Sequence, residues 1–486
     1  MKKIYLLAAL ISISCSLFAQ TPNFQNPFNN SSGAANNEVK NLTKDGSGNI
    51  YFCGKQAGEL DFNGTKLSAG KGGAYFGKAT SAGTIIWLNQ GGCTNSSGDN
   101  AYDIAVDKNG DVYVCGSLSG FQIASFNGTT LSTMYVGFVA KYSSSGQYLW
   151  AKGYGNVIYG IAIDNNNTPV VHWEQEVHRI DPANGEIVYT PYGSIAGNNM
   201  NPHYHNIKID AGNNIIVQAG NKIVKFDTNF NTLWSTPVTS SLAETYRISL
   251  DNSGNVYGSF YALFGTVTIG GNSKTNFPNG YMYKLDATTG NPLFVDVIQI
   301  GANASKIKDI IVDDSENYYL SGDGAFNTPH ILKLDKNKAP IWDKTLSTKI
   351  KVNGIVLLGS DCLSIGGIHS GIAALDTYTL KLPAGTTTLN NSFISGLCTG
   401  ITSSIEIGNN ADFQIYPNPS NGVFSVVSDS KNPEIEIYNL VGKLVYHSKS
   451  QSSTTTIDLT DQQSGIYFYR ITLEKQFTKS GRIIIN

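Results

Sequence analysis

The sequence predicts an all-β protein in which one long repetitive region is followed by a small, separate β domain. Three observations lead to this prediction. Short runs alternate apolar and polar residues, Asp/Asn/Gly turns separate these runs, and one paired pattern returns along the middle of the chain. The composition agrees, because Gly is abundant (51 residues) and charged residues are only 14%. Such usage is typical of β structure with many tight turns.

The N-terminus is typical of a secretory signal peptide. Lys2 and Lys3 precede an apolar run over 4–13, and Ala19 precedes Gln20. A charged start, a short apolar segment and a small residue predict a signal peptide over 1–19, cleaved between Ala19 and Gln20. The apolar run is too short for a membrane span, so we expect no transmembrane anchor. Residues 20–36, rich in Asn, Pro and Ser, are expected to form a flexible lead.

The first repeated element places alternating apolar residues on both sides of an Asp-led turn, which describes a β-hairpin. Its clearest form is Asp107-Lys-Asn-Gly-Asp-Val-Tyr-Val-Cys-Gly. Clear copies begin at Asp45, Asp107 and Asp251, looser copies at Asp164, Asp210 and Asp313, and a degenerate seventh copy covers 356–366.

A second hairpin follows each first one, as in Lys225-Phe-Asp-Thr-Asn-Phe-Asn-Thr-Leu-Trp. Two hairpins give four antiparallel strands per repeat, and the leading Asp recurs every 41 to 62 residues. This spacing predicts a seven-bladed β-propeller over 37–382, with six or eight blades also compatible. The copies of this second hairpin cover 78–87, 141–150, 179–188, 225–234, 284–294, 333–342 and 374–382.

Blades 1 and 2 carry an additional motif, Phe62-Asn-Gly-Thr-Lys-Leu in one and Phe126-Asn-Gly-Thr-Thr-Leu in the other. In these two blades the sequence resembles the bacterial β-propeller repeat family that is often found on secreted proteins. Residues 383–411 are rich in Thr, Asn, Ser and Gly and are expected to be a linker, with 393–398 packing on the ring.

The last segment, 412–486, shows about seven short alternating strands and predicts a small Ig-like β-sandwich. The segment carries, in order, a Tyr-Pro-Asn-Pro opening, a Gly-x-Phe, a Gly-Lys turn and a Gly-Ile-Tyr strand. The positions of these motifs are Tyr416, Pro417, Asn418, Pro419, Gly422, Gly442, Lys443, Gly465 and Tyr467. In these motifs and their order the segment resembles the type A C-terminal sorting domain of the type IX secretion system of Bacteroidetes. That resemblance implies passage through the outer membrane to the surface or the medium, with the secretion machinery and its sorting peptidase as partners.

Charge, motif and cysteine content narrow the set of functions that the sequence allows. A net charge of −2 without a basic run argues against a nucleic-acid partner. The sequence has no Cys-x-x-Cys pair and no hydrolase, metalloprotease or phosphate-loop motif, so we predict no metal and no cofactor. Five cysteines follow the signal peptide, and their pairing is left open by the sequence: Cys53, Cys93, Cys115, Cys362 and Cys398.

Candidate binding residues come from comparing the repeats. Loops at one face of the ring carry long inserts (56–73, 117–135 and 260–280) and the segment 191–206, and variable loops on a rigid scaffold commonly recognise ligands. Five residues before each turn Asp, at the same face, stand aromatic, imidazole or amine side chains that could ring the channel mouth. Packing against adjacent blades is the alternative interpretation of these residues. They are Lys40, Tyr102, Tyr159, His205, Tyr246 and Lys308.

The sequence therefore favours a secreted or cell-surface propeller that acts as a non-enzymatic binding or adhesion module for a glycan, a matrix polymer or a surface protein. Alternatives are an assembly scaffold, a hydrolase, or a propeller enzyme such as a quinone-dependent dehydrogenase. The last is suggested by similar repeats beginning at Ile180 and Leu285. The expected vicinal cysteines and calcium-binding carboxylates are missing, which weakens the dehydrogenase interpretation.

Overall fold

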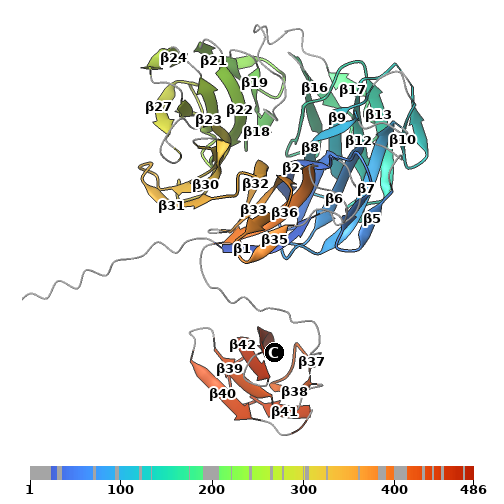
Figure 1. Cartoon of the computed structure of the whole chain (residues 1–486), viewed down its shortest axis with the longest axis vertical. Coiled ribbons are helices and arrows are strands. Elements are labelled where there is room, and N and C mark those ends of the chain that lie inside the picture. Colours follow the sequence, from blue (N-terminus) through green and yellow to red (C-terminus); the bar gives the residue numbers. More distant parts are fainter. Residues whose placement is uncertain are drawn as a thin grey trace, which may run out of the picture. The chain divides into compact units, whose positions relative to one another are not determined.

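The protein consists of β-strands in two compact units, 1–400 and 401–486, and no α-helix occurs among the described residues. A computed structural model (Figure 1) describes residues 23–29, 36–68, 73–93, 98–119, 123–132, 134–173, 176–189, 207–219, 222–239, 243–262, 266–275, 279–298, 300, 306–324, 327–359, 362–380, 390–398, 413–428, 433–439, 443–449, 452, 454–473 and 477–485. The predicted signal peptide, with Ala19 and Gln20, lies outside these residues.

The first unit is a β-propeller. Seven four-stranded antiparallel blades are present among the described residues, and in blades 1 and 4 two more strands join the sheet. Blade 1 comprises β2 (Glu38–Lys44), β3 (Ile50–Lys55), β6 (Ala74–Ala79) and β7 (Ile85–Cys93); blade 2 comprises β8 (Asn100–Val106), β9 (Val112–Ser117), β12 (Gly137–Tyr142) and β13 (Tyr148–Tyr154); blade 3 comprises β14 (Gly160–Ile163), β15 (Pro169–Trp173), β16 (Glu176–Ile180) and β17 (Ile187–Tyr189).

The remaining blades have the same order. Blade 4 comprises β18 (Ile207–Ile209), β19 (Ile215–Ala219), β20 (Lys222–Phe226) and β21 (Thr232–Thr239); blade 5 comprises β22 (Ala243–Leu250), β23 (Val256–Ala262), β26 (Asn279–Leu285) and β27 (Pro292–Ile298); blade 6 comprises β28 (Lys306–Val312), β29 (Tyr318–Asp323), β30 (Pro329–Leu334) and β31 (Pro340–Thr345); blade 7 comprises β32 (Ile350–Gly359), β33 (Cys362–Ser370), β36 (Asn390–Cys398) and β1 (Asn23–Asn29).

The innermost strands close a ring. Each of β2, β8, β14, β18, β22, β28 and β32 contacts the next, and β32 contacts β2. Figure 1 shows β2, β8, β18 and β32 near the centre of this unit. Apolar side chains from neighbouring blades share the cores, as where Tyr51 and Phe76 of blade 1 cluster with Val114 and Phe138 of blade 2. Stacked blades therefore bury faces that a lone blade would expose.

Blade 7 differs from the sequence-based expectation. The predicted flexible lead over 20–36 contains β1, which pairs antiparallel with β36 and forms the outer strand of this blade. The predicted linker over 383–411 contains β36, and a disulfide joins its Cys398 to Cys362 on β33. The stretch 374–382 was expected to be the second hairpin of repeat 7. Its described part, 374–380, lies instead in the separate pair β34 (Ala373–Leu375) and β35 (Tyr378–Leu380).

The physical reason is that local patterns do not reveal these strands. β36 lies inside a blade, so its Ser392 and Ser395 are buried beside Phe393, and its Ser/Asn-rich sequence looked like a linker. β1 contains Pro27, which an edge strand tolerates because one of its sides needs no partner. The propeller ring thus extends from 23 to 398 rather than from 37 to 382.

The turn motif of the first hairpin has a clear structural cause. The Asp251 carboxylate accepts hydrogen bonds from the backbone N–H groups of Ser253 (3.0 Å) and Asn255 (2.9 Å). It also accepts from Asn255 Nδ2 (2.8 Å) and Tyr257 Oη (3.0 Å), and Lys284 Nζ lies 3.6 Å away. The spacing Asp-x-x-Gly-Asn-x-Tyr is therefore the spacing of one hydrogen-bonded turn.

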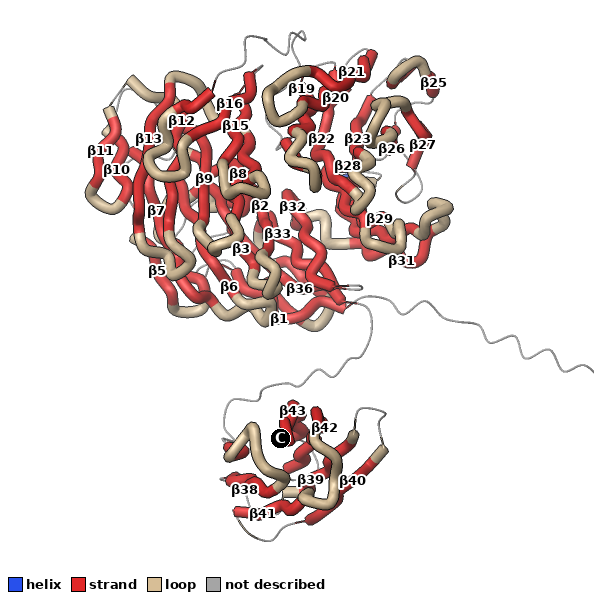
Figure 2. Tube along the Cα trace, turned by 180° about the vertical axis from the view of Figure 1, so that it is seen from behind, coloured by secondary structure: helices blue, strands red, loops and turns tan. Residues whose placement is uncertain are grey.

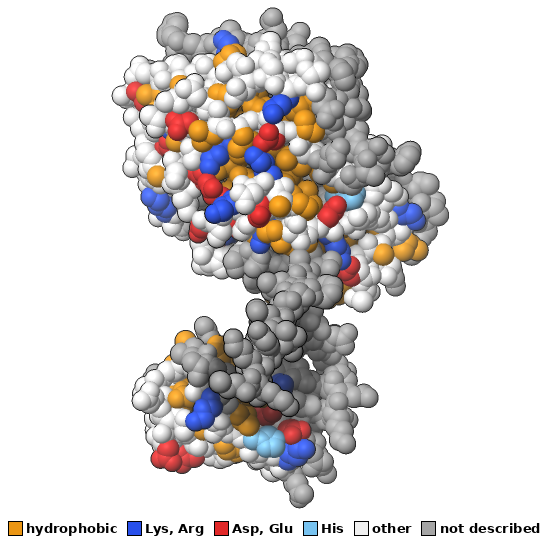
Figure 3. Space-filling view, turned by 90° about the vertical axis from the view of Figure 1, so that its left-hand side faces the viewer, with side chains coloured by type: hydrophobic (Ala, Val, Ile, Leu, Met, Phe, Trp, Pro, Cys, Tyr) orange, Lys and Arg blue, Asp and Glu red, His pale blue; other side chains and the backbone are white. Residues whose placement is uncertain are grey.

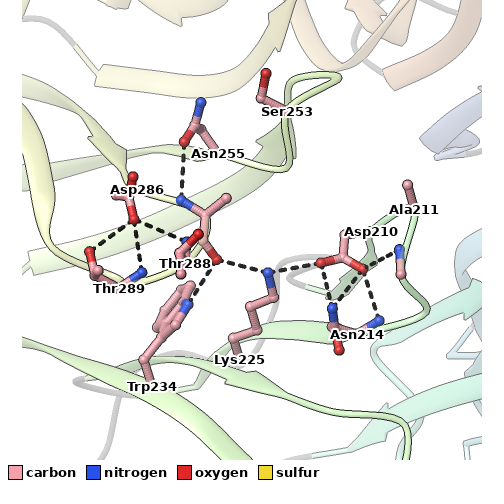
Figure 4. A network of polar contacts seen from close by, with 12 residues as sticks. Asp210, Ala211, Asn214, Lys225, Trp234, Ser253, Asn255, Asp286, Thr288 and Thr289 are labelled. Carbon is pink, nitrogen blue, oxygen red and sulfur yellow. Dashed lines mark hydrogen bonds and ion pairs between the residues drawn. The ribbon is translucent and has the colours of Figure 1, made fainter.

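The Lys and Trp of the second hairpin connect adjacent blades (Figure 4). Lys225 Nζ bridges the Asp210 carboxylate and the carbonyl of Ala287 in the next blade, both at 2.8 Å, and Trp234 Nε1 donates to the same carbonyl at 3.1 Å. A Cβ on Gly290 would approach the indole of Trp234 to 2.5 Å, so only glycine fits there. Lys141 and Trp150 bind the carbonyl of Pro182 in the same way.

The second unit is the small β-sandwich that the sequence predicted. Two sheets, β37-β38-β41 and β40-β39-β42-β43, enclose one core that includes Phe424, Ile435, Ile457 and Ile471. The strands are β37 (Phe413–Tyr416), β38 (Val423–Ser428), β39 (Glu434–Tyr438), β40 (Leu444–Lys449), β41 (Thr454–Asp458), β42 (Gly465–Leu473) and β43 (Phe477–Ile485).

Candidate functional site

β-Bulges mark one end of the channel in several blades. Lys40, Tyr102 and Lys308 are the extra residues where the pairing register shifts in β2, β8 and β28. Tyr246 lies in the register shift of β22, and Tyr159 immediately precedes β14. Because β-bulges change the direction of side chains, side chains from several blades can point toward the channel at this end.

The predicted ring residues are only partly brought together. The rings of Tyr102 and Tyr159, from blades 2 and 3, lie side by side with centroids 5.6 Å apart, and both side chains are half-buried. Lys40 pairs with Glu38 (2.7 Å) and Lys308 with Asp323 (2.5 Å). Burial lowers the pKa of Lys308, although Asp323 opposes this effect. His205 and the side chain of Tyr246 lie outside the described residues.

A polar layer, which the sequence analysis missed, lies one residue beyond the bulges. Asp103 of blade 2 accepts hydrogen bonds from Asn41 Nδ2 of blade 1 (2.5 Å) and from the backbone N–H of Ile161 of blade 3 (3.0 Å). Asp309 of blade 6 accepts from Arg247 Nη1 of blade 5 (2.8 Å) and from the backbone N–H of Ile355 of blade 7 (3.1 Å). Charged residues within otherwise apolar inner strands were the available signal.

Arg247 also reaches a blade that is not adjacent to its own. Its Nη2 donates to the carbonyl of Lys40 in blade 1 at 2.9 Å, and a Cβ on Gly354 would approach Nη1 to 2.9 Å. Blade 5 and blade 1 are separated by blades 6 and 7 around the ring. The guanidinium therefore spans the channel at this level and forms part of a polar barrier.

A cavity of about 470 Å³ lies in the channel on the turn side of this layer. All seven inner strands contribute to its wall, which combines aliphatic residues such as Ile163 and Ile209 with polar residues such as Thr43 and Ser249. Lys44 and Lys208 are the lysines in its lining, and both are exposed. The cavity is thus at the opposite end of the channel from the predicted ring of Tyr and Lys side chains.

The acidic groups of the channel are engaged in holding the blades together. Both carboxylates of the polar layer accept several hydrogen bonds, and no cluster of three or more potential metal ligands occurs among the described residues. This arrangement can bind and orient a ligand.

The inserts form small hairpins at the outside of the ring, and Figure 2 shows β10, β11 and β25 at its edge. β10 (Ala124–Phe126) and β11 (Thr129–Leu131) extend blade 1, and β24 (Thr266–Ile269) and β25 (Asn272–Thr275) extend blade 4. β4 (Leu60–Phe62) and β5 (Thr65–Leu67) form a two-stranded sheet of their own. The segment 191–206 lies outside the described residues.

The sorting motif builds turns of the sandwich. Asn418 Oδ1 accepts from the backbone N–H of Ile484 (2.9 Å), and the N–H of Lys443 donates to Asn439 Oδ1 (2.9 Å). Tyr467 is buried and donates to the carbonyl of Gln463 (2.7 Å). Tyr416 remains 52% exposed, next to Pro417 and Pro419. Gly422 and Gly465 have positive φ, and Gly442 lies outside the described residues.

Comparison with known families decides what this second unit is. Residues 414–486 match the family described as "Secretion system C-terminal sorting domain". The chain carries a type IX sorting domain. A sorting domain of this kind directs the protein to the cell surface or the extracellular space. Residues 86–117, from β7 to β9, match the family described as "Beta-propeller repeat", which confirms the resemblance seen in blades 1 and 2. No helix among the described residues is long and apolar enough to cross a membrane.

Other similarities are partial. The ulvan lyase NLR42 of Nonlabens ulvanivorans is 32% identical over 87 residues, which are 18% of this chain and 16% of that protein, so the chain spans about a sixth of that relative. PorZ of Porphyromonas gingivalis, a surface component of the type IX secretion system, is 13% identical in sequence to this chain. The structural match covers 92% of this chain and 81% of the PorZ chain, with a TM-score of 0.30. The crystal structure of a Bacteroides caccae protein of unknown function is 10% identical in sequence to this chain. The match covers 64% of this chain and 94% of that one, with a TM-score of 0.37.

The visible propeller face in Figure 3 carries Lys, Arg, Asp and Glu side chains interspersed among apolar ones. Mixed charges on that face agree with the small net charge of the chain.

Proposed function

We propose that this exported propeller is a non-enzymatic binding module that recognises a glycan, a matrix polymer or a surface protein with its insert-bearing face. The observation that carries the proposal is the half-buried pair Tyr102–Tyr159 at the channel end of that face. Paired aromatic rings offer a rigid apolar platform with hydroxyl groups at its margin, which suits sugars and protein side chains alike. Lys40 and Lys308 belong to the same proposed ring, as do His205 and Tyr246.

The engagement of the channel carboxylates also supports binding rather than catalysis. A general acid or base needs a proton that it can exchange with a substrate, whereas Asp103 and Asp309 are buried and hydrogen-bonded between blades. The lyase relative matches only 18% of the chain, so its activity gives no support to an enzymatic role here. The proposal includes no cofactor. It includes the type IX machinery and its sorting peptidase as partners of 412–486.

The test is a binding screen of the mature chain against oligosaccharides and isolated surface polymers, scored for both binding and depolymerisation. We expect binding without any shortening of the polymer. The double variant Tyr102→Ala/Tyr159→Ala should lose that binding, while Tyr378→Ala, which removes another partly exposed tyrosine on β35, should retain it. Shortened products would establish an enzyme instead, and binding that survives the double variant would remove the tyrosine pair from the site.

A further inference from the structure

The cavity of about 470 Å³ in the channel has its floor at the polar layer. Its lining runs from Asp103 and Arg247 of that layer to the turn ends of the inner strands, and it includes none of the described bulge residues Lys40, Tyr102 and Lys308. The guanidinium of Arg247 spans the channel at the floor. A molecule therefore enters from the turn side, and a polymer can enter only by its end. The volume lies within the usual range of small-ligand sites, roughly 300–1,000 Å³.

Two lysines stand at the open end of the cavity. Lys208 of β18 follows Ile207, which is buried in the core between blades 3 and 4, so the side chain of Lys208 faces the channel instead. Lys44 is the last residue of β2, and both lysines are exposed and belong to the lining. Around the ring, two blades separate blade 1 from blade 4 on one side and three on the other. The two lysines therefore lie on nearly opposite sides of the opening.

Both lysines keep their charge available. Within the described part of the chain, neither side chain forms an ion pair or a hydrogen bond. The acidic residues that follow them along the chain are used by their own turns, since Asp210 binds Lys225 at 2.8 Å and Asp45 lies 3.7 Å from Lys78. An anion on the axis of the channel would be attracted to both lysines at once.

The floor and the wall have a different chemistry from the rim. The charge of Asp309 is balanced by Arg247 at 2.8 Å, and Asp103 accepts hydrogen bonds from uncharged donors. A second carboxylate beside these two would be repelled. Thr43 and Ser249 add hydroxyl groups to the wall. A ligand with hydroxyl groups at one end and a negative charge at the other would match this arrangement, with its charged end at the rim.

We propose that this cavity binds a sugar acid, either a free hexuronate or the hexuronate at the end of a polymer. Its hydroxyl groups point toward the polar layer and its carboxylate lies between Lys44 and Lys208. The inference goes beyond the proposed function, because this site is at the opposite end of the channel from Tyr102 and Tyr159. The polar layer separates the two sites, so each can be tested without the other.

The test is calorimetric titration of the mature full-length chain with glucuronate, galacturonate and trigalacturonate, and with glucose as the neutral comparator. We expect a hexuronate to bind about tenfold or more tightly than glucose, with an affinity that falls as NaCl rises from about 50 to about 500 mM. Lys44→Gln and Lys208→Gln should each weaken binding by about threefold to tenfold. The double variant should lose the salt dependence and keep the melting temperature of the wild type, because both side chains are exposed.

Lys336→Gln is the matched control. Lys336 is an exposed lysine in the turn between β30 and β31 and does not line the cavity, so its replacement should change neither affinity nor salt dependence. A trimer that binds more tightly than the monomers would identify a polymer end as the ligand, and the reverse order would identify the free sugar acid.

Two results would overturn the proposal: glucose binding as tightly as the hexuronates, or no binding of any of them. An unchanged affinity in the double lysine variant would do so as well. Loss of hexuronate binding in Tyr102→Ala/Tyr159→Ala, with normal binding in the lysine variants, would move the sugar acid to the other end of the channel. Polymer binding that depends on the tyrosine pair, without any hexuronate binding, would remove this inference and leave the proposed function in place.

Discussion

At the scale of single residues, Arg247 has the most consequential environment, because one buried guanidinium contacts blades 1 and 6 from blade 5. Its Asp309 partner is only 4% exposed and also binds the backbone of blade 7. Desolvating two charges is costly, so such a pair stabilises the fold only while it is intact. Because this ion pair links blade 5 to blades 1 and 6 at the centre of the ring, it fixes the positions of these blades relative to one another.

Arg247→Met is therefore expected to destabilise the propeller by about 3–5 kcal/mol, because Asp309 would be left buried without its cation. Denaturant unfolding of the mature chain measures the change. Lys152→Met is the matched control, because it breaks the exposed pair with Glu186 and should cost about 0–1 kcal/mol. Equal effects of the two substitutions would show that the central ion pair contributes nothing special.

The turn aspartates predict an acid dependence that differs between blades. Burial raises the pKa of Asp251, but hydrogen bonds from Asn255 and Tyr257 outweigh it, and the net pKa is lowered. Its ionised form is thus favoured by folding, and this contribution is lost as the pH falls through the lowered pKa. In Asp107 burial again raises the pKa, and the nearby charge of Asp111 adds to it, so the net pKa is raised.

Asp251→Asn should then lower the free energy of unfolding at pH 6, and the difference from wild type should shrink on acidification below about pH 4. Asp107→Asn should show the opposite trend, since the wild type gains a favoured proton at low pH that the variant lacks. Unfolding curves between pH 6 and 3 check both. Parallel pH profiles for the two variants would contradict this interpretation of the turns.

At the scale of elements, the closure of the ring depends on β1, the first described strand, which completes blade 7 through β36. Phe24 of β1 is buried in the core that contains Trp342, Leu375 and Phe393, and its backbone N–H donates to Asp376 at 2.9 Å. β1 covers a strand edge that would otherwise be open to pairing with another chain.

Deleting residues 20–29 should lower the melting temperature and promote aggregation, because the edge of β36 and its apolar neighbours become exposed. Thermal scans and light scattering of the mature chain would show both effects. Deleting only 20–22, which leaves β1 in place, is the control and should behave as the wild type. A truncated chain as stable and as monomeric as the wild type would mean that β1 is dispensable.

These elements also show what a sequence can and cannot predict. The hairpins led by Asp45 and Asp251 were predicted because their hydrogen bonds join residues six or fewer positions apart. β1 and β36 were missed because Phe24 pairs with Leu397, far along the chain, and no local pattern records that pairing. The pair β34–β35 was mistaken for a blade hairpin because its alternation is the same. Tyr102 and Tyr159 were predicted to lie together at the mouth of the channel because they occupy equivalent positions in two repeats. The contacts of Arg247 could not be predicted, since they form only once the ring is closed.

At the scale of the whole molecule, the chain divides its tasks between two compact units, a ring that ends at Cys398 and a sandwich that begins at Phe413. Each has its own core, so each is expected to unfold as its own cooperative unit. Among the described residues, the core clusters of the propeller contain propeller residues alone, and the core cluster of the sandwich contains sandwich residues alone. We therefore expect the cores of the ring to persist when the sorting unit is removed.

Deletion of 412–486 should accordingly trap a folded propeller in the periplasm, because the sorting signal is lost while the residues of the ring are unchanged. Fractionation of cells checks the location, and protease resistance of the trapped chain checks the fold. The control is Arg247→Met with its sorting domain intact, which tests whether instability alone blocks export. Recovery of the truncated chain outside cells at normal yield would contradict the assigned role of the sandwich. Degradation of the truncated chain but not of the control would show instead that the ring depends on its tail.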